Sequence, residues 1–254
     1  MGIVDVDLTG KVAVITGGSR GLGKDIAVAM ARRGAQVTIC GRKQENLDKA
    51  VDEFKKDDME VVSFPANVGK ADQVEALFQE VGKKFGKLDI LVNNAGMNIF
   101  TPAVAEVDEG LWDKTLETNL KGPFLTAKHG LELFKKAGGG KIINITSIAA
   151  RKAAIGMGIY CVAKAGVEML TKVLALELAQ TGIKVNAVAP GMVKTQFSMP
   201  FWSNEDLLKE ITKSIPMGRI AEIDDVVGAV LFLASDMSNY ITGEIITVDG
   251  GSTA

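Results

Sequence analysis

The chain has 254 residues, 47% of them hydrophobic, so residues 1–254 can bury the core of one large α/β domain. Its 29 basic and 31 acidic residues give a net charge of -2, which argues against nucleic acid or an anionic membrane as partner. The two cysteines lack metal-ligand spacing, and the chain has one histidine. The first residues include acids where a signal peptide has lysines. We therefore expect a cytoplasmic protein without a metal ion.

The first predicted strand, residues 11–16, leads into a glycine-rich turn and then into a helical pattern that continues to residue 33. The glycines have the spacing Gly17-x-x-x-Gly21-x-Gly23. Glycines let the backbone approach a pyrophosphate, and the following helix N-terminus supplies amide donors and a positive dipole. The arrangement therefore favours a bound nucleotide over a tight turn without a ligand.

The second predicted strand, residues 36–40, ends in Gly41, Arg42 and Lys43 before a charged helix over residues 44–56. An NAD site places an acid here, about 20 residues past the glycines, to bind the ribose 2′-hydroxyl. This chain offers cations instead, and Arg20 of the glycine turn can approach the same corner from the other side. We predict NADP(H) as the preferred cofactor with NAD(H) possible; the alternative is that Arg42 and Lys43 only begin a solvated helix.

Strands and helices alternate through the rest of the chain. We predict strands over residues 60–64, 89–92, 141–146, 183–188 and 244–248, and helices over residues 71–85, 109–137 (kinked at Pro123), 158–181, 204–214 and 222–234. This order predicts an α/β fold: a single-domain, Rossmann-type, doubly wound parallel sheet of about seven strands with helices on both faces. The dinucleotide-binding part would cover about residues 10–145 and a substrate loop about residues 190–215.

The chemistry is expected where a hydroxyl, a phenol and an amine share one short piece of chain. Tyr160 and Lys164 are four residues apart at the start of a predicted helix, so both project from one face. The ammonium should then lower the pKa of the phenol from its usual ~10, as a general acid/base requires. Ser147 follows a buried strand and thus lies on the ligand side of the sheet. A Tyr-x-x-x-Lys pair also arises by chance on a helix surface.

Residues 192–202 show no period yet are crowded with apolar side chains, which is typical of a lid or an interface. We expect the substrate pocket to be apolar. Its predicted lining is Met97, Ile99, Ile148, Met157, Met192, Phe197 and Trp202.

Taken together and in this order, the motifs resemble the short-chain dehydrogenase/reductase family. They are Thr16-Gly-x-x-x-Gly-x-Gly23, Asn93-Asn-Ala-Gly96, Asn119, Ser147, Tyr160-x-x-x-Lys164, Pro190-Gly191 and Ile246-Thr-Val-Asp-Gly-Gly251. The match runs the whole chain. Residues 42–48, 112–116 and 194–198 are similar to NADPH-dependent carbonyl and retinal reductases of that family.

The resemblance implies roles for single residues. Tyr160 would donate the proton in reduction, Lys164 would lower its pKa and bind the nicotinamide ribose, Ser147 would hold the substrate oxygen, and Asn119 would anchor a water molecule. The implied cofactor contacts are Gly17, Ser19, Arg20, Gly21, Leu22, Gly23, Arg42, Lys43, Asn67, Val68, Asn94, Ala95, Gly96, Tyr160, Lys164, Pro190, Gly191, Val193 and Thr195. Asn67 departs from the aspartate that the family often has beside the adenine, although an amide can still accept that hydrogen bond.

Three functions remain open. The first is an NADP(H)-dependent reductase or dehydrogenase of a small, largely apolar ketone or secondary alcohol. The second is a 3-oxoacyl-carrier-protein reductase or a sugar or polyol dehydrogenase, although Glu132 and Leu176 stand where carrier-binding relatives have basic residues. The third is an NADP-binding regulator without turnover. Helices 109–137 and 158–181 have few charges on one face, so a homotetramer is expected, with a small-molecule substrate as the other partner.

Overall fold

The core of the molecule is a parallel β-sheet, seen in a computed structural model that describes residues 6–97, 100–101 and 103–254. Its strands are β1 (Val12–Thr16), β2 (Gln36–Gly41), β3 (Val61–Pro65), β4 (Ile90–Asn93), β5 (Gly140–Ile145), β6 (Ile183–Pro190) and β7 (Ile245–Val248). They lie in the order β3-β2-β1-β4-β5-β6-β7, and every neighbouring pair is parallel.

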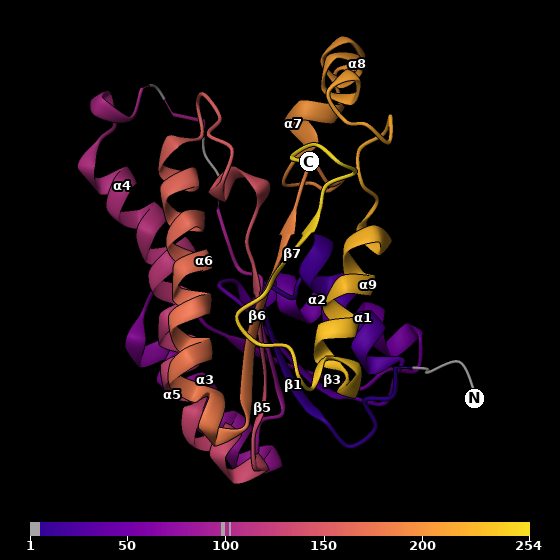
Figure 1. Cartoon of the computed structure of the whole chain (residues 1–254). Coiled ribbons are helices and arrows are strands. Elements are labelled where there is room, and N and C mark those ends of the chain that lie inside the picture. Colours follow the sequence, from indigo (N-terminus) through magenta and orange to yellow (C-terminus); the bar gives the residue numbers. More distant parts are fainter. Residues whose placement is uncertain (1–5, 98–99, 102) are drawn as a thin grey trace.

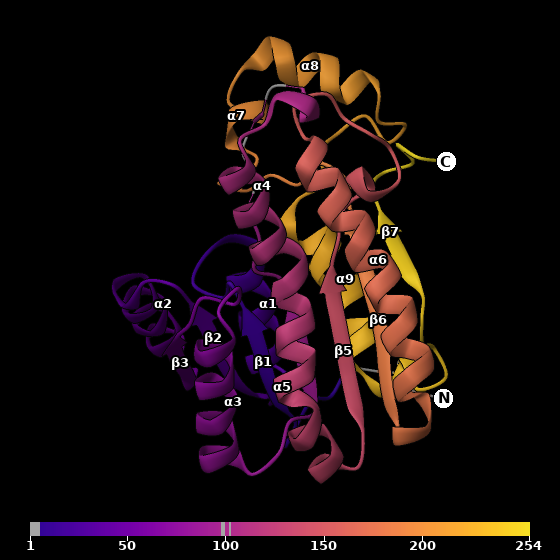
Figure 2. The same cartoon turned by 90° about the vertical axis from the view of Figure 1, so that its left-hand side faces the viewer.

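Helices cover both faces of this sheet (Figure 1). One layer contains α1 (Gly21–Ala31), α2 (Gln44–Lys56) and α9 (Ile223–Ala234), and the other contains α3 (Ala71–Phe85), α4 (Glu109–Leu116), α5 (Gly122–Ala137) and α6 (Gly158–Leu178). Figure 2 looks onto the second layer and shows α7 (Met199–Trp202) and α8 (Glu205–Lys213) beyond the carboxyl ends of the strands. The prediction of a Rossmann-type, doubly wound parallel sheet is confirmed.

Strand β1 shows why the sequence of a central strand is a nearly unbroken run of apolar residues. All five of its residues are buried, because helices cover both faces. Successive side chains alternate between the two layers: Ala13 and Ile15 belong to the core beneath α1 and α9, while Val12 and Val14 belong to the core beneath α3 and α5. The sheet therefore separates two hydrophobic cores.

The order of the strands reverses beside β1. The chain passes from β1 outward to β2 and β3, then returns to β4 on the other side of β1. The loops that follow β1 and β4 therefore run in opposite directions and leave a crevice above the carboxyl ends, where open α/β sheets bind ligands.

A chain of buried hydrogen bonds holds β4, β5, α5 and α6 in register beneath that crevice. The Thr126 hydroxyl donates to Asn93 Oδ1 (2.6 Å), the Asn93 amide donates to Asn144 Oδ1 (2.9 Å), and the Asn144 amide donates to Thr171 Oγ1 (2.8 Å). All four side chains are buried. A fully satisfied network of this kind fixes a unique packing, here of the two strands and two helices that carry the site.

The predicted helix over residues 109–137 is interrupted shortly before Pro123. A π-helical segment, Glu117–Lys121, separates α4 from α5. Pro123 lies in the first turn of α5, two residues after this segment ends. The irregularity therefore takes the form of a π-helical segment directly before the proline.

The segment 192–202 also differs from the prediction, because α7 forms one turn of helix at its end. The following helix, α8, is capped by Asn204, whose side chain accepts from the backbone N–H groups of Asp206 and Leu207, both at 3.0 Å. The two helices lie opposite the upper parts of α4 and α6 (Figure 1).

The described residues contain no helix that is both long and apolar enough to span a bilayer. Nor do they bring three or more His, Cys, Asp or Glu side chains together at a place that could hold a metal ion. Cys40 and Cys161 are free thiols. Burial raises the pKa of Cys40 to about 12, which leaves that thiol unreactive at neutral pH.

Candidate active site

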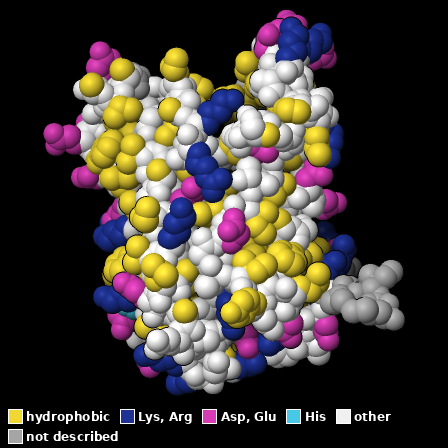
Figure 3. Space-filling view, in the orientation of Figure 1, with side chains coloured by type: hydrophobic (Ala, Val, Ile, Leu, Met, Phe, Trp, Pro, Cys, Tyr) yellow, Lys and Arg dark blue, Asp and Glu magenta, His cyan; other side chains and the backbone are white. Residues whose placement is uncertain are grey.

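A cavity of about 780 Å³ opens at the carboxyl edge of the sheet. It runs from the glycine turn and the end of β2, past the first turn of α6, to the α7 and α8 segment. In the space-filling view the surface is hollowed between that segment and the upper ends of the opposite helices (Figure 3). Every residue predicted to contact the cofactor lines this cavity. The cofactor atoms that each residue contacts stay a prediction.

The glycine turn has the shape of a phosphate cradle. Gly21 has φ +53°, and a Cβ added there would point into open space, so the backbone itself faces the cavity. A Cβ on Gly23 would lie 2.3 Å from Asn94 Nδ2, so only glycine permits this approach. No side chain caps the first amides of α1, and its first turn holds no acid. These amides remain available to an anion.

Asn94 ties the end of β4 to the glycine turn. Its backbone N–H donates to Thr16 Oγ1 (3.0 Å), and its side-chain amide donates to the carbonyl oxygens of Thr16 (3.0 Å) and Gly17 (3.3 Å). Asn94 therefore lines the cavity as predicted, while its side chain shapes the turn. This role depends on the pairing of β1 with β4 and has no local sequence signal.

The end of the cavity beside the glycine turn and β2 is lined by cationic side chains. Arg20, Arg42 and Lys43 are exposed there and line its wall. Among the described residues that line the cavity, none is an aspartate or a glutamate. The cradle fits the pyrophosphate of NAD(P)(H), and the cations at this corner would attract a phosphate that a carboxylate would repel.

The predicted reacting groups converge near the middle of the cavity. Ser147, Tyr160 and Lys164 line the same stretch of wall. The Lys164 ammonium donates to the carbonyl oxygen of Ile145 (2.8 Å), the last residue of β5, and its Nζ lies 5.6 Å from the centre of the Tyr160 ring. Ser147 Oγ accepts from the backbone N–H of Ala149 (3.1 Å), which orients the hydroxyl.

Burial controls the protonation of the pair. Desolvation raises the pKa of Tyr160 to about 12, although a hydrogen bond with Ser147 acts in the opposite direction. Desolvation likewise lowers the pKa of Lys164 to about 8. The expectation of a lowered phenol pKa is therefore wrong, because the cost of desolvating a phenolate raises it. Near pH 7 the phenol is protonated, which is the form a proton donor needs.

Asn119 does not line the cavity. It is fully buried in the π-helical segment, where its Oδ1 accepts from the Met97 N–H and its Nδ2 donates to the Met97 carbonyl oxygen, both at 2.8 Å. A Cβ on the adjacent Gly96 would lie 3.1 Å from Asn119 Oδ1 and 3.9 Å from Lys164 Nζ. The side chain therefore positions residues 96–97 beside the lysine; the predicted water anchor stays a prediction.

The substrate end of the cavity is mainly apolar. Of the predicted lining, Met97, Ile148, Met157, Met192 and Phe197 lie in its wall, and Ile99 lies outside the described residues. The Phe197 ring centre is 6.3 Å from that of Tyr160, so this side chain closes the site above the phenol.

Trp202 does not line the cavity, and the prediction that it does is wrong. Its indole N–H donates to the Thr195 carbonyl oxygen (2.9 Å), while the preceding residue, Phe201, enters the wall. Ile211 and Ile215 also line the cavity and were not predicted. Ile211 lies in α8 and Ile215 just after that helix ends, and the sequence does not indicate that either one faces the cavity.

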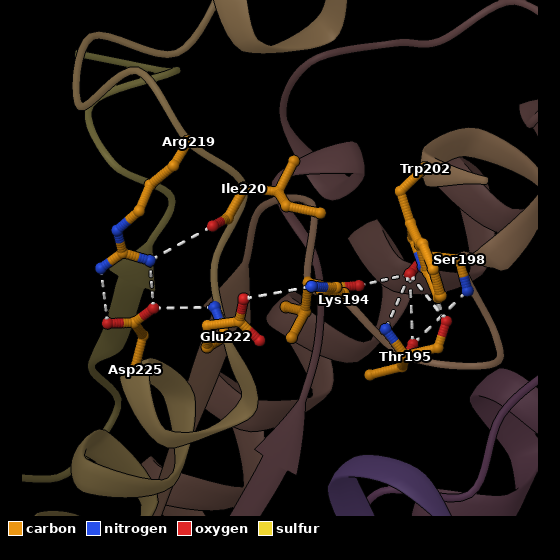
Figure 4. Close-up of polar contacts among 9 residues, drawn as sticks. Lys194, Thr195, Ser198, Trp202, Arg219, Ile220, Glu222 and Asp225 are labelled. Atoms are coloured by element: carbon orange, nitrogen blue, oxygen red, sulfur yellow. Dashed lines mark hydrogen bonds and ion pairs between the residues drawn. The ribbon is translucent and has the colours of Figure 1, made fainter. Parts of the chain in front are cut away.

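A set of polar contacts fixes the segment that carries Thr195 (Figure 4). The Lys194 N–H donates to the Ala221 carbonyl oxygen (2.9 Å), and the Ala221 N–H donates to the Met192 carbonyl oxygen (2.8 Å). The Thr195 hydroxyl and N–H both contact Ser198 Oγ at 3.2 Å. The predicted cofactor segment is thereby attached to the chain before α9 on one side and to α7 on the other.

The N-terminus of α9 anchors that attachment. Arg219 forms a two-pronged pair with Asp225 (2.6 and 2.9 Å), and Asp225 Oδ2 also accepts from the Glu222 N–H (2.8 Å). The arginine lowers the pKa of Asp225 to about 2. Glu222 in turn lies 3.7 Å from Lys194 Nζ. Neither Arg219 nor Asp225 belongs to a motif, which explains why sequence analysis assigned them no role.

Comparisons with known proteins agree with this geometry. A family model described as Enoyl-(Acyl carrier protein) reductase matches residues 17–253. Human Dehydrogenase/reductase SDR family member 4 is 39% identical over 245 residues, covering 96% of this chain and 88% of the relative. Human Dehydrogenase/reductase SDR family member 2, mitochondrial, is 39% identical over 246 residues, covering 97% of this chain and 88% of the relative.

Solved structures give the same result. A gluconate 5-dehydrogenase from Burkholderia cenocepacia, in complex with NADP and tartrate, superposes with a TM-score of 0.93 at 32% identity, covering 98% of this chain and 97% of that chain. The fold and the site therefore define an NAD(P)-dependent oxidoreductase that acts on CH–OH groups. The chain belongs to the short-chain dehydrogenase/reductase family.

Proposed function

We propose that the protein is an NADP(H)-dependent reductase that interconverts a small, largely apolar ketone and its secondary alcohol. The observation that carries this proposal is the convergence of the Ser147 hydroxyl, the Tyr160 phenol and the Lys164 ammonium in one cavity. The cationic corner at the other end of that cavity supports the choice of NADP(H) over NAD(H).

The residues divide the work of the reaction. When bound, NADPH supplies the hydride. Ser147 donates a hydrogen bond to the ketone oxygen, Tyr160 gives that oxygen its proton as the alkoxide develops, and Lys164 holds the position beside the phenol. The segment from Met192 to Phe197, together with Phe201 of α7, lines the site on one side. A regulator without turnover has no need of a proton donor placed in this way.

The lining supports an apolar ketone as substrate. Met157, Phe197, Phe201 and Ile211 present hydrocarbon to the space beside Tyr160. A 3-oxoacyl-carrier-protein reductase is less well supported, because Leu176 is 82% exposed where carrier-binding relatives have a basic residue. A sugar or polyol dehydrogenase stays an alternative, since the gluconate 5-dehydrogenase structure has the same fold.

A substrate panel followed at the NADPH absorbance tests this proposal. Aryl and alkyl ketones are expected to be reduced faster than sugars or acyl thioesters, because the lining offers few partners for several hydroxyls. Glucose and gluconate, assayed in oxidation with NADP⁺, are the controls. Faster turnover of either one than of any ketone or its alcohol would favour the polyol dehydrogenase instead.

We also propose a homotetramer. The outer surfaces of α5 and α6 expose Phe124, Val162, Met169, Val173 and Leu176, and apolar side chains gather over this side of the molecule in Figure 3. Contiguous exposed apolar surface of this kind marks an interface. Light scattering is expected to give the mass of four 26.9-kDa chains. A monomer mass, or an unchanged mass in Leu176→Glu combined with Met169→Glu, would refute this interface.

A cytoplasmic location is proposed from the sequence pattern alone. One human relative carries the word mitochondrial in its name, so the relatives do not themselves support this location.

A further inference from the structure

One cation in the cavity has no role in the site described above. Arg20, Arg42 and Lys43 face the cofactor corner, and Lys164 is held under the phenol. Lys152 is the remaining lysine in the wall. It follows the short 3-10 turn Ile148–Ala150 that Ser147 caps, so only four residues separate it from a predicted catalytic hydroxyl and it belongs to the substrate side of the site.

Lys152 and its neighbour Arg151 have opposite surroundings. The Arg151 guanidinium is paired with the buried carboxylate of Glu168 (2.9 Å) and also donates to the Thr247 hydroxyl (3.2 Å), and it does not line the cavity. Lys152 forms no ion pair with any carboxylate of the described residues. Its Nζ makes one long contact, 3.4 Å, with the Ser252 carbonyl oxygen. Its charge is therefore available to a ligand.

Lys152 is the cation among the few side-chain donors at this part of the wall, which also includes the Gln196 amide. Ala153 and Ala154, the next two residues, line the wall with short side chains. The Ser214 and Ser252 hydroxyls line the wall, but they already donate to the backbone carbonyl oxygens of residues 211 (2.8 Å) and 249 (2.7 Å). Each hydroxyl has only one proton to donate, so the Lys152 ammonium is the charged donor that remains for an anion here.

We propose, on the basis of the reductase function above, that Lys152 binds a carboxylate of the substrate. The substrate is then an oxo acid with an apolar body: the ketone meets Tyr160, the body packs against Phe197 and Phe201, and the carboxylate reaches Lys152. A single ammonium suits a carboxylate, whereas a phosphate favours the fork of an arginine or several donors together. The reaction is unchanged, with hydride added to the carbonyl carbon and a proton to its oxygen.

A matched pair of probes isolates the charge. 3-Benzoylpropionate is an aryl ketone with a carboxylate, and its methyl ester has the same ketone without the charge. The wild-type enzyme with NADPH is expected to have a kcat/KM about five- to tenfold higher for the acid, between the effect of an exposed ion pair and that of a charged hydrogen bond inside a site. Lys152→Gln should bring the ratio to about one, and Lys152→Arg should retain it.

The matched control is Lys43→Gln, which removes a lysine from the cofactor end of the same wall. It is expected to raise the KM for NADPH and to leave the acid-to-ester ratio unchanged. An equal kcat/KM for acid and ester in the wild type, or a ratio that survives Lys152→Gln, would overturn the proposal. Lys152 would then only hold the C-terminal segment through Ser252, and the variant would change the melting temperature alone.

A binding measurement separates this proposal from the proposed function. Calorimetric titration of 3-benzoylpropionate into the NADP⁺-loaded protein is expected to show a Kd about fivefold or more weaker for Lys152→Gln than for wild type. If neither compound is reduced, the ketone reductase function fails, while a Lys152-dependent Kd still supports the carboxylate site. Equal Kd values for wild type and variant would contradict the site whatever the turnover.

Discussion

Tyr160→Phe is expected to lower kcat for ketone reduction by a factor of about 10²–10⁴, the usual contribution of a positioned general acid. The substitution removes one hydroxyl and keeps the ring that packs beside Phe197. Fold and NADPH affinity should therefore be retained, which circular dichroism and the quenching of protein fluorescence by NADPH would show. Kinetics at saturating NADPH measure the loss.

Tyr240→Phe is the control for this substitution, because Tyr240 is the other tyrosine of the chain and is fully exposed. It should behave as the wild type. Near-normal turnover by Tyr160→Phe would remove this residue from the mechanism.

The rate of alcohol oxidation should rise with pH. Burial raises the pKa of Tyr160 to about 12, so the phenol is a proton donor across neutral pH. Alcohol oxidation needs the phenolate and should therefore accelerate as the pH rises.

The wild-type enzyme is expected to use NADPH with a kcat/KM roughly 10- to 100-fold above that with NADH, as one or two charged hydrogen bonds to a 2′-phosphate would give. Combining Gly41→Asp with Arg42→Ala should abolish or invert this preference, since a carboxylate repels the phosphate and binds the ribose diol. The site has room for it. A Cβ on Gly41 would make ordinary contacts of 3.5 Å with Leu47 and 3.6 Å with Ser19.

Arg32→Ala is the matched control for the cofactor variant. Arg32 is a surface arginine at the far end of α1, where it pairs with Asp57 (3.3 Å) away from the cavity. This control should leave the ratio of the two cofactors unchanged. Equal or better efficiency with NADH in the wild type would show that Arg42 and Lys43 face water and do not bind phosphate.

The sequence was sufficient to predict the helices and strands that are marked by a local pattern of apolar and charged residues. Helices α2 and α3 have the predicted bounds, because each combines a buried apolar stripe with charged residues at its ends. The unbroken apolar strands likewise predicted a sheet covered on both faces. The π-helical segment could not be predicted, since it is associated with the contact between Asn119 and Met97, which are distant in sequence.

The site was predictable to the level of motifs and not of side-chain directions. Phe201 and Trp202 are adjacent aromatic residues, and only the turn of α7 decides that the first enters the cavity while the second binds the Thr195 carbonyl oxygen. The pKa of Tyr160 had the wrong predicted direction for a similar reason. Spacing predicts which groups are neighbours, whereas burial depends on everything that packs around them.

The transfer of label from the cofactor to the product tests the central claim most directly. NADPH carrying deuterium at both C4 positions would be incubated with the enzyme and an aryl ketone, and the alcohol analysed by mass spectrometry. The account predicts an alcohol with one deuterium on its carbinol carbon, formed by wild type and Tyr240→Phe and nearly absent with Tyr160→Phe. An unlabelled alcohol, or no alcohol from any ketone, would contradict it.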